Sequence, residues 1–472
     1  MPTSSPPDRK GLTFLSILAL LFATAVPAQT LAHRNWAGSG LTASHWWRNA
    51  IFYRVDPTHF QDSDNDGTGD LRGLSLRLDY LQSLGVDALI LSSPNPSDPG
   101  FDDLLAAASQ RHLRLIVALR STPSVNLLAA ARSWLTRGAA GIELLATDPN
   151  TDQVVDTLTV LHTLTRTFPG ERIVLAGFDH PLSAPPPKGA DLLDTPITLS
   201  PFQIPQLSPN TTPTPLLLTD QINRSATTNA IADTPAAALS LDETAAILLL
   251  TTPGPISLLY GQELGLQQPL DATMQWTPTN LTPPNFTEPN PEPTEPTPTT
   301  PPPPHRPDPN VYGAFVPYVP PKISKPTPTV FDPNNLRGFT TNPTAQSAGA
   351  PRNAAEEDRD PKSLLNFYRR LIQLHHDNLT LRSGAVVPLH HDNILAWLRV
   401  LPSAARTNPP ILIVCNPTDH PISFDPTNDM APYHARHLAF RTLLTSAPLF
   451  TIETTESFTL PAHTVYIGEL YR

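Results

Sequence analysis

A short acidic loop near the start of the chain has the spacing of a metal-binding site. Residues 62–70 read Asp-Ser-Asp-Asn-Asp-Gly-Thr-Gly-Asp, so a side-chain oxygen recurs at every second position: Asp62, Asp64, Asp66, Thr68 and Asp70. Alternating carboxylates, with glycines that let the chain turn, are how a short loop surrounds a hard cation with oxygen ligands. We therefore predict that these five residues bind Ca²⁺. The alternative is a solvated turn rich in Asp and Gly.

The segments around this loop predict alternating strands and helices. Residues 50–55 and 86–91 have strand composition, and residues 71–84 between them have helical periodicity ended by Gly85. Further helices are expected at 102–110, 126–136, 152–167 and 236–250, and further strands at 113–119, 141–146, 172–176, 192–199 and within 253–265. The seventh strand has two candidates, 216–219 and 230–232. This alternation favours an α/β fold with a closed parallel barrel at residues 45–277.

The remainder of the chain divides by composition. Residues 278–350 are rich in Pro, Thr, Asn and Glu, a composition that cannot bury a core. A linker or stalk is favoured there over a recognition surface. Residues 351–384 contain an amphipathic helix, and residues 385–472 carry short apolar runs separated by Pro and Asn turns. We expect the last barrel helix followed by a C-terminal antiparallel β-sandwich domain.

The N-terminus and the composition bound the location and the partners. Arg9 and Lys10 precede an apolar run at residues 12–26, and small residues lead to Ala28, which predicts a signal peptide at residues 1–28 and a secreted or periplasmic protein. A retained anchor is the alternative, although a span needs about 20 apolar residues. No membrane span is expected after cleavage. The net charge of -11 argues against nucleic-acid binding. Cys415, the single cysteine, is expected in the core.

Several motifs resemble a known family. Trp46, Trp47, Pro57 and Phe60 flank the acidic loop as in the first strand of the α-amylase superfamily, glycoside hydrolase family 13, in its α-glucosidase-like branch. Residues 274–276, Met-Gln-Trp, also resemble that family. The resemblance implies a TIM (β/α)8 barrel with a C-terminal β domain. It also implies carbohydrate metabolism and an α-glucan or α-glucoside ligand.

The catalytic motifs of that family are altered in this chain. A retaining glycosidase needs two carboxyl groups about 5 to 5.5 Å apart at the barrel mouth. On the third strand, the positions that are Asp, Asn and His in the family hold Ala118, Thr122 and Pro123. On the fourth strand, the positions of the Arg and of the nucleophile hold Glu143 and Leu145. On the fifth strand, the position of the general acid holds Phe178. Asp179 follows Phe178 by one residue. Of the family's seventh-strand motif, Asn-His-Asp, this chain keeps at best the Asp, as Asp233. A leucine cannot attack an anomeric carbon.

Two hypotheses follow. In the first, the protein is catalytically degenerate and binds a sugar or a protein partner. In the second, it is an active α-glucosidase or α-amylase that uses shifted carboxylates, namely Glu143, Asp179 or Asp233. Because residues 143 and 145 share a strand face, Glu143 should point into the barrel, as a buried carboxylate paired with a neighbour such as Arg120. The family's inserted domain B after the third strand is also missing. In this respect the chain resembles the non-enzymatic ectodomains of amino-acid-transporter heavy chains, although a cleavable signal argues against a membrane-anchored subunit.

Overall fold

The computed structural model describes most of the chain after residue 44. The described residues are 45–92, 94, 98, 100–121, 126–146, 152–178, 189–197, 216–220, 235–266, 273–276, 339, 352–391, 393–401, 408–430, 439–447, 450, 452 and 457–471. The predicted signal peptide and almost all of the Pro-rich stretch at residues 278–350 lie outside them.

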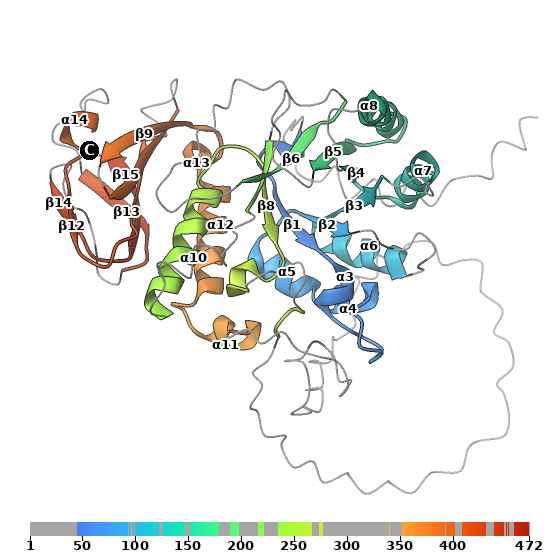
Figure 1. Cartoon of the computed structure of the whole chain (residues 1–472), viewed down its shortest axis with the longest axis horizontal. Coiled ribbons are helices and arrows are strands. Elements are labelled where there is room, and N and C mark those ends of the chain that lie inside the picture. Colours follow the sequence, from blue (N-terminus) through green and yellow to red (C-terminus); the bar gives the residue numbers. More distant parts are fainter. Residues whose placement is uncertain are drawn as a thin grey trace, which may run out of the picture.

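Eight parallel strands form a closed barrel in which each pairs with the next and β8 pairs with β1 (Figure 1). They are β1 Ile51–Val55, β2 Ala88–Ser92, β3 Arg114–Arg120, β4 Gly141–Ala146, β5 Ile173–Phe178, β6 Leu192–Ile197, β7 Leu216–Asp220 and β8 Ile256–Leu259. The expected parallel barrel is therefore present. Its seventh strand forms at the first of the two candidate segments, and the second candidate, residues 230–232, lies outside the described residues.

Helices cover the outside of the barrel. They are α3 Pro57–Phe60, α4 Leu71–Leu76, α5 Leu78–Leu84, α6 Gly100–Gln110, α7 Leu127–Arg137, α8 Asp152–Arg166, α10 Pro235–Leu250, α11 Ala354–Arg359, α12 Leu364–Asp377 and α13 Leu379–Ser383. The single helix predicted at residues 71–84 is two helices. The break falls at Arg77, whose φ of -106° and ψ of 8° leave the helical region, and whose side chain reaches back to Gln61.

The two faces of the barrel strands enter different apolar clusters. Outward side chains such as Tyr53 and Leu89 pack with the helices. Inward side chains from β1, β2, β3, β5 and β6 join Trp47 and Ala50 in a second cluster: Phe52, Ala88, Ile90, Ile116, Ala118, Ile173, Leu175 and Leu192. The barrel interior is thus a packed core, as the period-2 alternation of strands requires.

The Trp-Trp pair that precedes β1 is tied to the N-terminal side of β5. It lies in the 3-10 turn η1 Trp46–Asn49. Trp47 Nε1 donates to Glu171 Oε1 at 3.2 Å, and Trp46 Nε1 donates to the Glu171 carbonyl at 3.3 Å. His45 adds a 2.7 Å contact from Nδ1 to the same carboxylate. These bonds fix the entry of the chain into the barrel.

The C-terminal region is antiparallel. A five-stranded sheet has the order β13-β15-β11-β10-β9, and β12 pairs with β14. The strands are β9 Ala385–His391, β10 Ile394–Val400, β11 Ile411–Asn416, β12 Ile422–Phe424, β13 Ala439–Thr445, β14 Phe458–Leu460 and β15 Thr464–Tyr471, with the short helix α14 Thr427–Met430. Residues of both sheets share one apolar cluster, which includes Val414, Phe424 and Leu460.

The opposite face of the five-stranded sheet packs toward the barrel through α10 and α12, which lie between the two parts (Figure 1). Cys415 is fully buried on this face, as expected. Two polar side chains bind the carboxyl end of α10. His375 Nδ1 donates to the Leu250 carbonyl at 2.9 Å, and Arg399 donates to the carbonyls of Thr251 and Gly384. Among the described helices, none combines the length and the apolar character needed to cross a bilayer.

Candidate functional site

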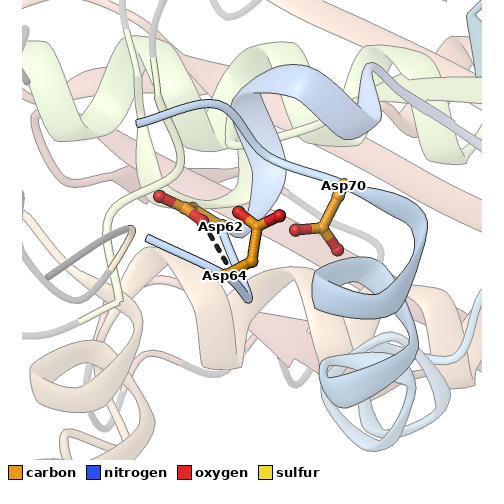
Figure 2. A group of neighbouring side chains, drawn as sticks. All are labelled: Asp62, Asp64 and Asp70. Atoms are coloured by element: carbon orange, nitrogen blue, oxygen red, sulfur yellow. Dashed lines mark hydrogen bonds between the residues drawn. The ribbon is translucent and has the colours of Figure 1, made fainter. Parts of the chain in front are cut away.

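The acidic loop lies between α3 and α4, in the connection from the first barrel strand to the second. One carboxylate oxygen each from Asp62, Asp64 and Asp70 lie within 4.8 Å of one another. Figure 2 shows the three side chains gathered between the two limbs of the loop. The loop therefore brings together residues from both of its ends.

Backbone hydrogen bonds fold this loop around Asp62. The Asp62 carboxylate accepts from the N–H groups of Asp64 at 3.1 Å, Asn65 at 2.7 Å and Gly67 at 2.9 Å. Asn65 and Gly67 have φ values of 68° and 96°, a left-handed conformation that Asn and Gly tolerate best. The Asn-Asp-Gly sequence is what lets the chain turn here.

The other end of the loop is fixed by Asp70. This residue caps α4, because its Oδ1 accepts from Gly73 N at 2.6 Å. Its two oxygens also accept from Ser63 Oγ and Ser63 N, both at 2.9 Å. These donors are neutral groups, so they orient the carboxylate without cancelling its charge. An all-oxygen cluster with three formal negative charges suits a hard cation such as Ca²⁺.

Asp66, another of the five predicted ligands, is not part of this group of carboxylates, and Thr68 has no carboxylate to contribute to it. Asp66 and Thr68 are exposed, and Asp66 Oδ1 accepts from Thr68 N at 2.7 Å. The converging carboxylates are those of Asp62, Asp64 and Asp70.

Glu143 lies in the barrel interior and is fully buried. Its two carboxylate oxygens accept from Nη1 and Nη2 of Arg54, both at 2.7 Å. A Cβ atom placed on Gly177 of β5 would lie 2.9 Å from Glu143 Oε1 and 2.7 Å from a methyl carbon of Leu145. Glu143 and Leu145 therefore both project across β5, as the strand alternation predicts.

A second carboxylate completes the charged group in the barrel. Arg54 Nη2 also donates to Asp194 Oδ2 on β6. Arg54 and Asp194 are 8% and 7% exposed, so the network is almost completely shielded from solvent. Burial alone would lower the pKa of the Arg54 guanidinium, but Glu143 and Asp194 outweigh it and hold that pKa above its ordinary value.

The structure corrects one expectation for Glu143. A paired, buried carboxylate was expected, but with a partner such as Arg120; the partner shown is Arg54, while Arg120 is exposed at the end of β3. Asp179 and Asp233, the other candidate substitutes, lie outside the described residues, as do Thr122 and Pro123. Sequence reasoning missed Arg54 and Asp194. The available signal was a charged residue inside each of two apolar strand segments.

Comparison with known proteins finds a family that matches the opening segment of the barrel. The family described as "Alpha amylase, catalytic domain" matches residues 54–102. Residues 54–102 are therefore similar to the opening segment of an alpha-amylase-family catalytic domain. This matched segment runs from the end of β1 through α3, the acidic loop, α4, α5 and β2 to the start of α6. Trp46 and Trp47 lie just before it.

Curated relatives match over the same part of the chain. An alpha-glucosidase from Pediococcus pentosaceus is 38% identical over 95 residues, which cover 16% of this chain and 17% of the relative. A probable oligo-1,6-glucosidase from Bacillus subtilis is 49% identical over 61 residues, covering 12% of this chain and 11% of the relative. The matched part thus spans under a fifth of these relatives, both of which are glucosidases by name.

Solved structures extend the likeness to the whole fold. A trehalose-6-phosphate hydrolase from Bacillus licheniformis has a TM-score of 0.62 at 12% identity, covering 90% of this chain and 100% of the other. An isomaltulose synthase from a Klebsiella species has a TM-score of 0.58 at 15% identity, with 90% of this chain and 99% of the other covered. At these identities the likeness establishes the fold alone.

Proposed function

We propose that this protein is an α-glucosidase-like member of the alpha-amylase family that has lost hydrolysis and binds an α-glucoside, an α-glucan or a protein partner. The observation that carries the proposal is the identity and burial of two residues on β4. The position corresponding to the family nucleophile holds Leu145, and the nearest carboxylate on the same face, Glu143, is fully buried and held by both Nη atoms of Arg54. A carboxylate shielded in this way cannot reach an anomeric carbon.

The competing proposal is an active hydrolase with displaced carboxylates. Arg54 Nη2 donates to both Glu143 and Asp194, so the two carboxylates share one nitrogen. Two neighbouring carboxyl groups are the minimum that a retaining mechanism requires. Their burial weighs against it, because a sugar ring must reach between them. Asp179 and Asp233 remain the other residues that this alternative would use.

We further propose that Asp62, Asp64 and Asp70 bind Ca²⁺, with Asp66 and Thr68 as additional oxygen donors on the exposed side of the loop. The ion would neutralise the converging carboxylates and tie α3 to α4. Its chemistry there is structural, since the loop lies between two helices that follow β1. The sequence features at residues 1–28 support the companion proposal that the mature protein is secreted or periplasmic.

The decisive experiment is a turnover and binding assay on purified protein. We expect no release of 4-nitrophenol from 4-nitrophenyl α-glucoside and no shortening of maltooligosaccharides above a protein-free blank. Titration calorimetry with the same maltooligosaccharides tests binding without turnover. If the protein hydrolyses either substrate and the Asp179→Asn, Asp233→Asn or Glu143→Gln variant abolishes this while its circular dichroism spectrum is unchanged, the active-hydrolase alternative is correct.

A further inference from the structure

Two segments that are distant in sequence meet at the acidic loop. Residues 273–276 precede the Pro-rich stretch and Phe339 follows most of it, so the two segments flank residues 277–338. The first segment contacts Phe60, and the second contacts Gln61 and Asp62. These three residues lie at the start of the metal loop or immediately before it. The flanks of the longest low-complexity stretch in the chain are therefore fixed at one place.

The first flank is held by Trp276. Its Nε1 donates to the Phe60 carbonyl at 2.8 Å, and its ring meets those of Phe60 and Tyr80 edge-on, with 5.1 Å between centres in each case. Trp276 is 3% exposed. Two residues earlier, Met274 N donates to the His59 carbonyl at 2.8 Å. This flank packs on α3, immediately before the acidic loop.

The second flank is held by Phe339, which is 1% exposed. Its carbonyl accepts from Asp62 N at 3.0 Å and from Gln61 Nε2 at 2.7 Å. Asp62 thus contacts Phe339 through its backbone, while its carboxylate organises the metal loop. A shift of Phe339 must displace the backbone of a predicted metal ligand.

Gln61 joins the two flanks to the far end of the loop. Its backbone carbonyl accepts from Asp70 N at 3.0 Å, and its side-chain Oε1 accepts from Arg77 Nε at 2.7 Å. The Arg77 guanidinium carbon in turn lies 4.2 Å from the ring centre of Trp276, a favourable cation–π distance. Asp62 and Asp70, from opposite ends of the loop, are therefore held through one buried residue.

From these contacts we propose that Phe339 is a positioning residue of the metal loop, and that cation binding and the anchoring of both flanks of residues 277–338 are coupled. The proposal rests on the proposed calcium site. With Phe339 in place, Asp62 is already held in the binding conformation, so less ordering accompanies binding. Because coupling free energy is reciprocal, a bound cation must stabilise the Phe339 contact to the same extent.

Calcium affinity of the full chain tests this proposal. Titration calorimetry of chelator-treated protein is expected to show Ca²⁺ binding that weakens roughly tenfold in Phe339→Ala. Phe339→Leu, which keeps an apolar side chain, should restore most of the affinity. Phe315→Ala, a substitution of the same kind within the Pro-rich stretch, is the matched control and should bind like the unmodified protein. Gln61→Leu is a second variant, which removes the side-chain bonds of residue 61 to Phe339 and to Arg77 without altering Phe339.

Hydrogen exchange measures the effect of bound Ca²⁺ on the contact between Asp62 and Phe339. Ca²⁺ should slow exchange of the Asp62 amide in the unmodified protein, and should slow it less in Phe339→Ala. If both Phe339→Ala and Gln61→Leu bind Ca²⁺ as tightly as the unmodified protein, the coupling is wrong while the calcium site stands. If the unmodified protein itself binds no Ca²⁺, the calcium site is wrong and the coupling is wrong with it.

Discussion

Arg54 on β1 and Glu143 on β4 form a two-bond ion pair across the interior of the barrel, with both Nη···Oε distances at 2.7 Å. The residues are 89 positions apart in sequence. Bidentate pairing of this kind fixes the orientation of the carboxylate. Because of this ion pair, Glu143, a candidate catalytic residue, is part of the buried interior of the barrel.

Loss of Glu143 should destabilise the fold severely. In Glu143→Ala the Arg54 guanidinium keeps Asp194 but loses a fully buried partner, and breaking a buried pair costs about 3 to 5 kcal/mol. Urea unfolding monitored by tryptophan fluorescence measures the change. Asp79→Ala is the matched control, because Asp79 pairs with Arg111 at 2.6 Å on the surface and such pairs contribute about 0 to 1 kcal/mol. Equal effects of the two substitutions would contradict the structural role of Glu143.

Calcium should raise the thermal stability of the protein through the acidic loop. A ligand that binds only the folded state adds about 2.7 kcal/mol at a concentration of 100 times its Kd. Differential scanning calorimetry should therefore show a melting temperature that rises with added Ca²⁺ and falls with a chelator. Asp62→Asn should lose this response, whereas Asp103→Asn, on the exposed side of α6, should keep it. A melting temperature indifferent to Ca²⁺ in the unmodified protein would rule the site out.

His375 should make the protein less stable in acid. Burial lowers its pKa from 6.5 to about 3, with His376, Arg399 and Arg382 adding to this effect and the bond to the Leu250 carbonyl opposing it. Between these two pKa values the unfolded chain binds a proton that the folded chain does not, so stability falls as the pH falls from about 6.5 toward 3. Urea unfolding at a series of pH values should show a shallower dependence in His375→Gln. The same pH dependence in His375→Gln as in the unmodified protein would contradict this assignment.

Glu243 should make the protein less stable as the pH rises. Burial raises its pKa from 4.5 to about 7, with Asp242 contributing and Arg370 and Arg352 opposing. The folded chain therefore holds a proton that the unfolded chain releases, and this stabilisation is lost as the pH rises from about 4.5 through 7. Relative to Glu243→Gln, the unmodified protein should lose stability across that range in the same urea series. A constant difference between the two proteins from pH 4.5 to 8 would refute this assignment.

Much of the fold follows from local sequence. The period-2 and helical patterns predict β1 to β6 closely, and Asn126 caps α7 where the helix was expected to begin. These features depend on neighbours within a few residues, whose side chains decide backbone conformation directly. The turn at Asn65 and Gly67 is of the same kind. The sequence by itself therefore determined the order of elements, the barrel and the position of the acidic loop.

Tertiary structure decided what the charged residues do. Sequence alternation placed Glu143 inside the barrel, but its partner comes from β1, which only barrel closure brings across the interior. Likewise, the contact of Phe339 with Asp62 joins positions separated by seven of the eight barrel strands. Arg77 interrupts a helix that its own sequence favours, and it binds Gln61 and Trp276 instead. Such pairings depend on distances through space, which spacing along the chain does not encode.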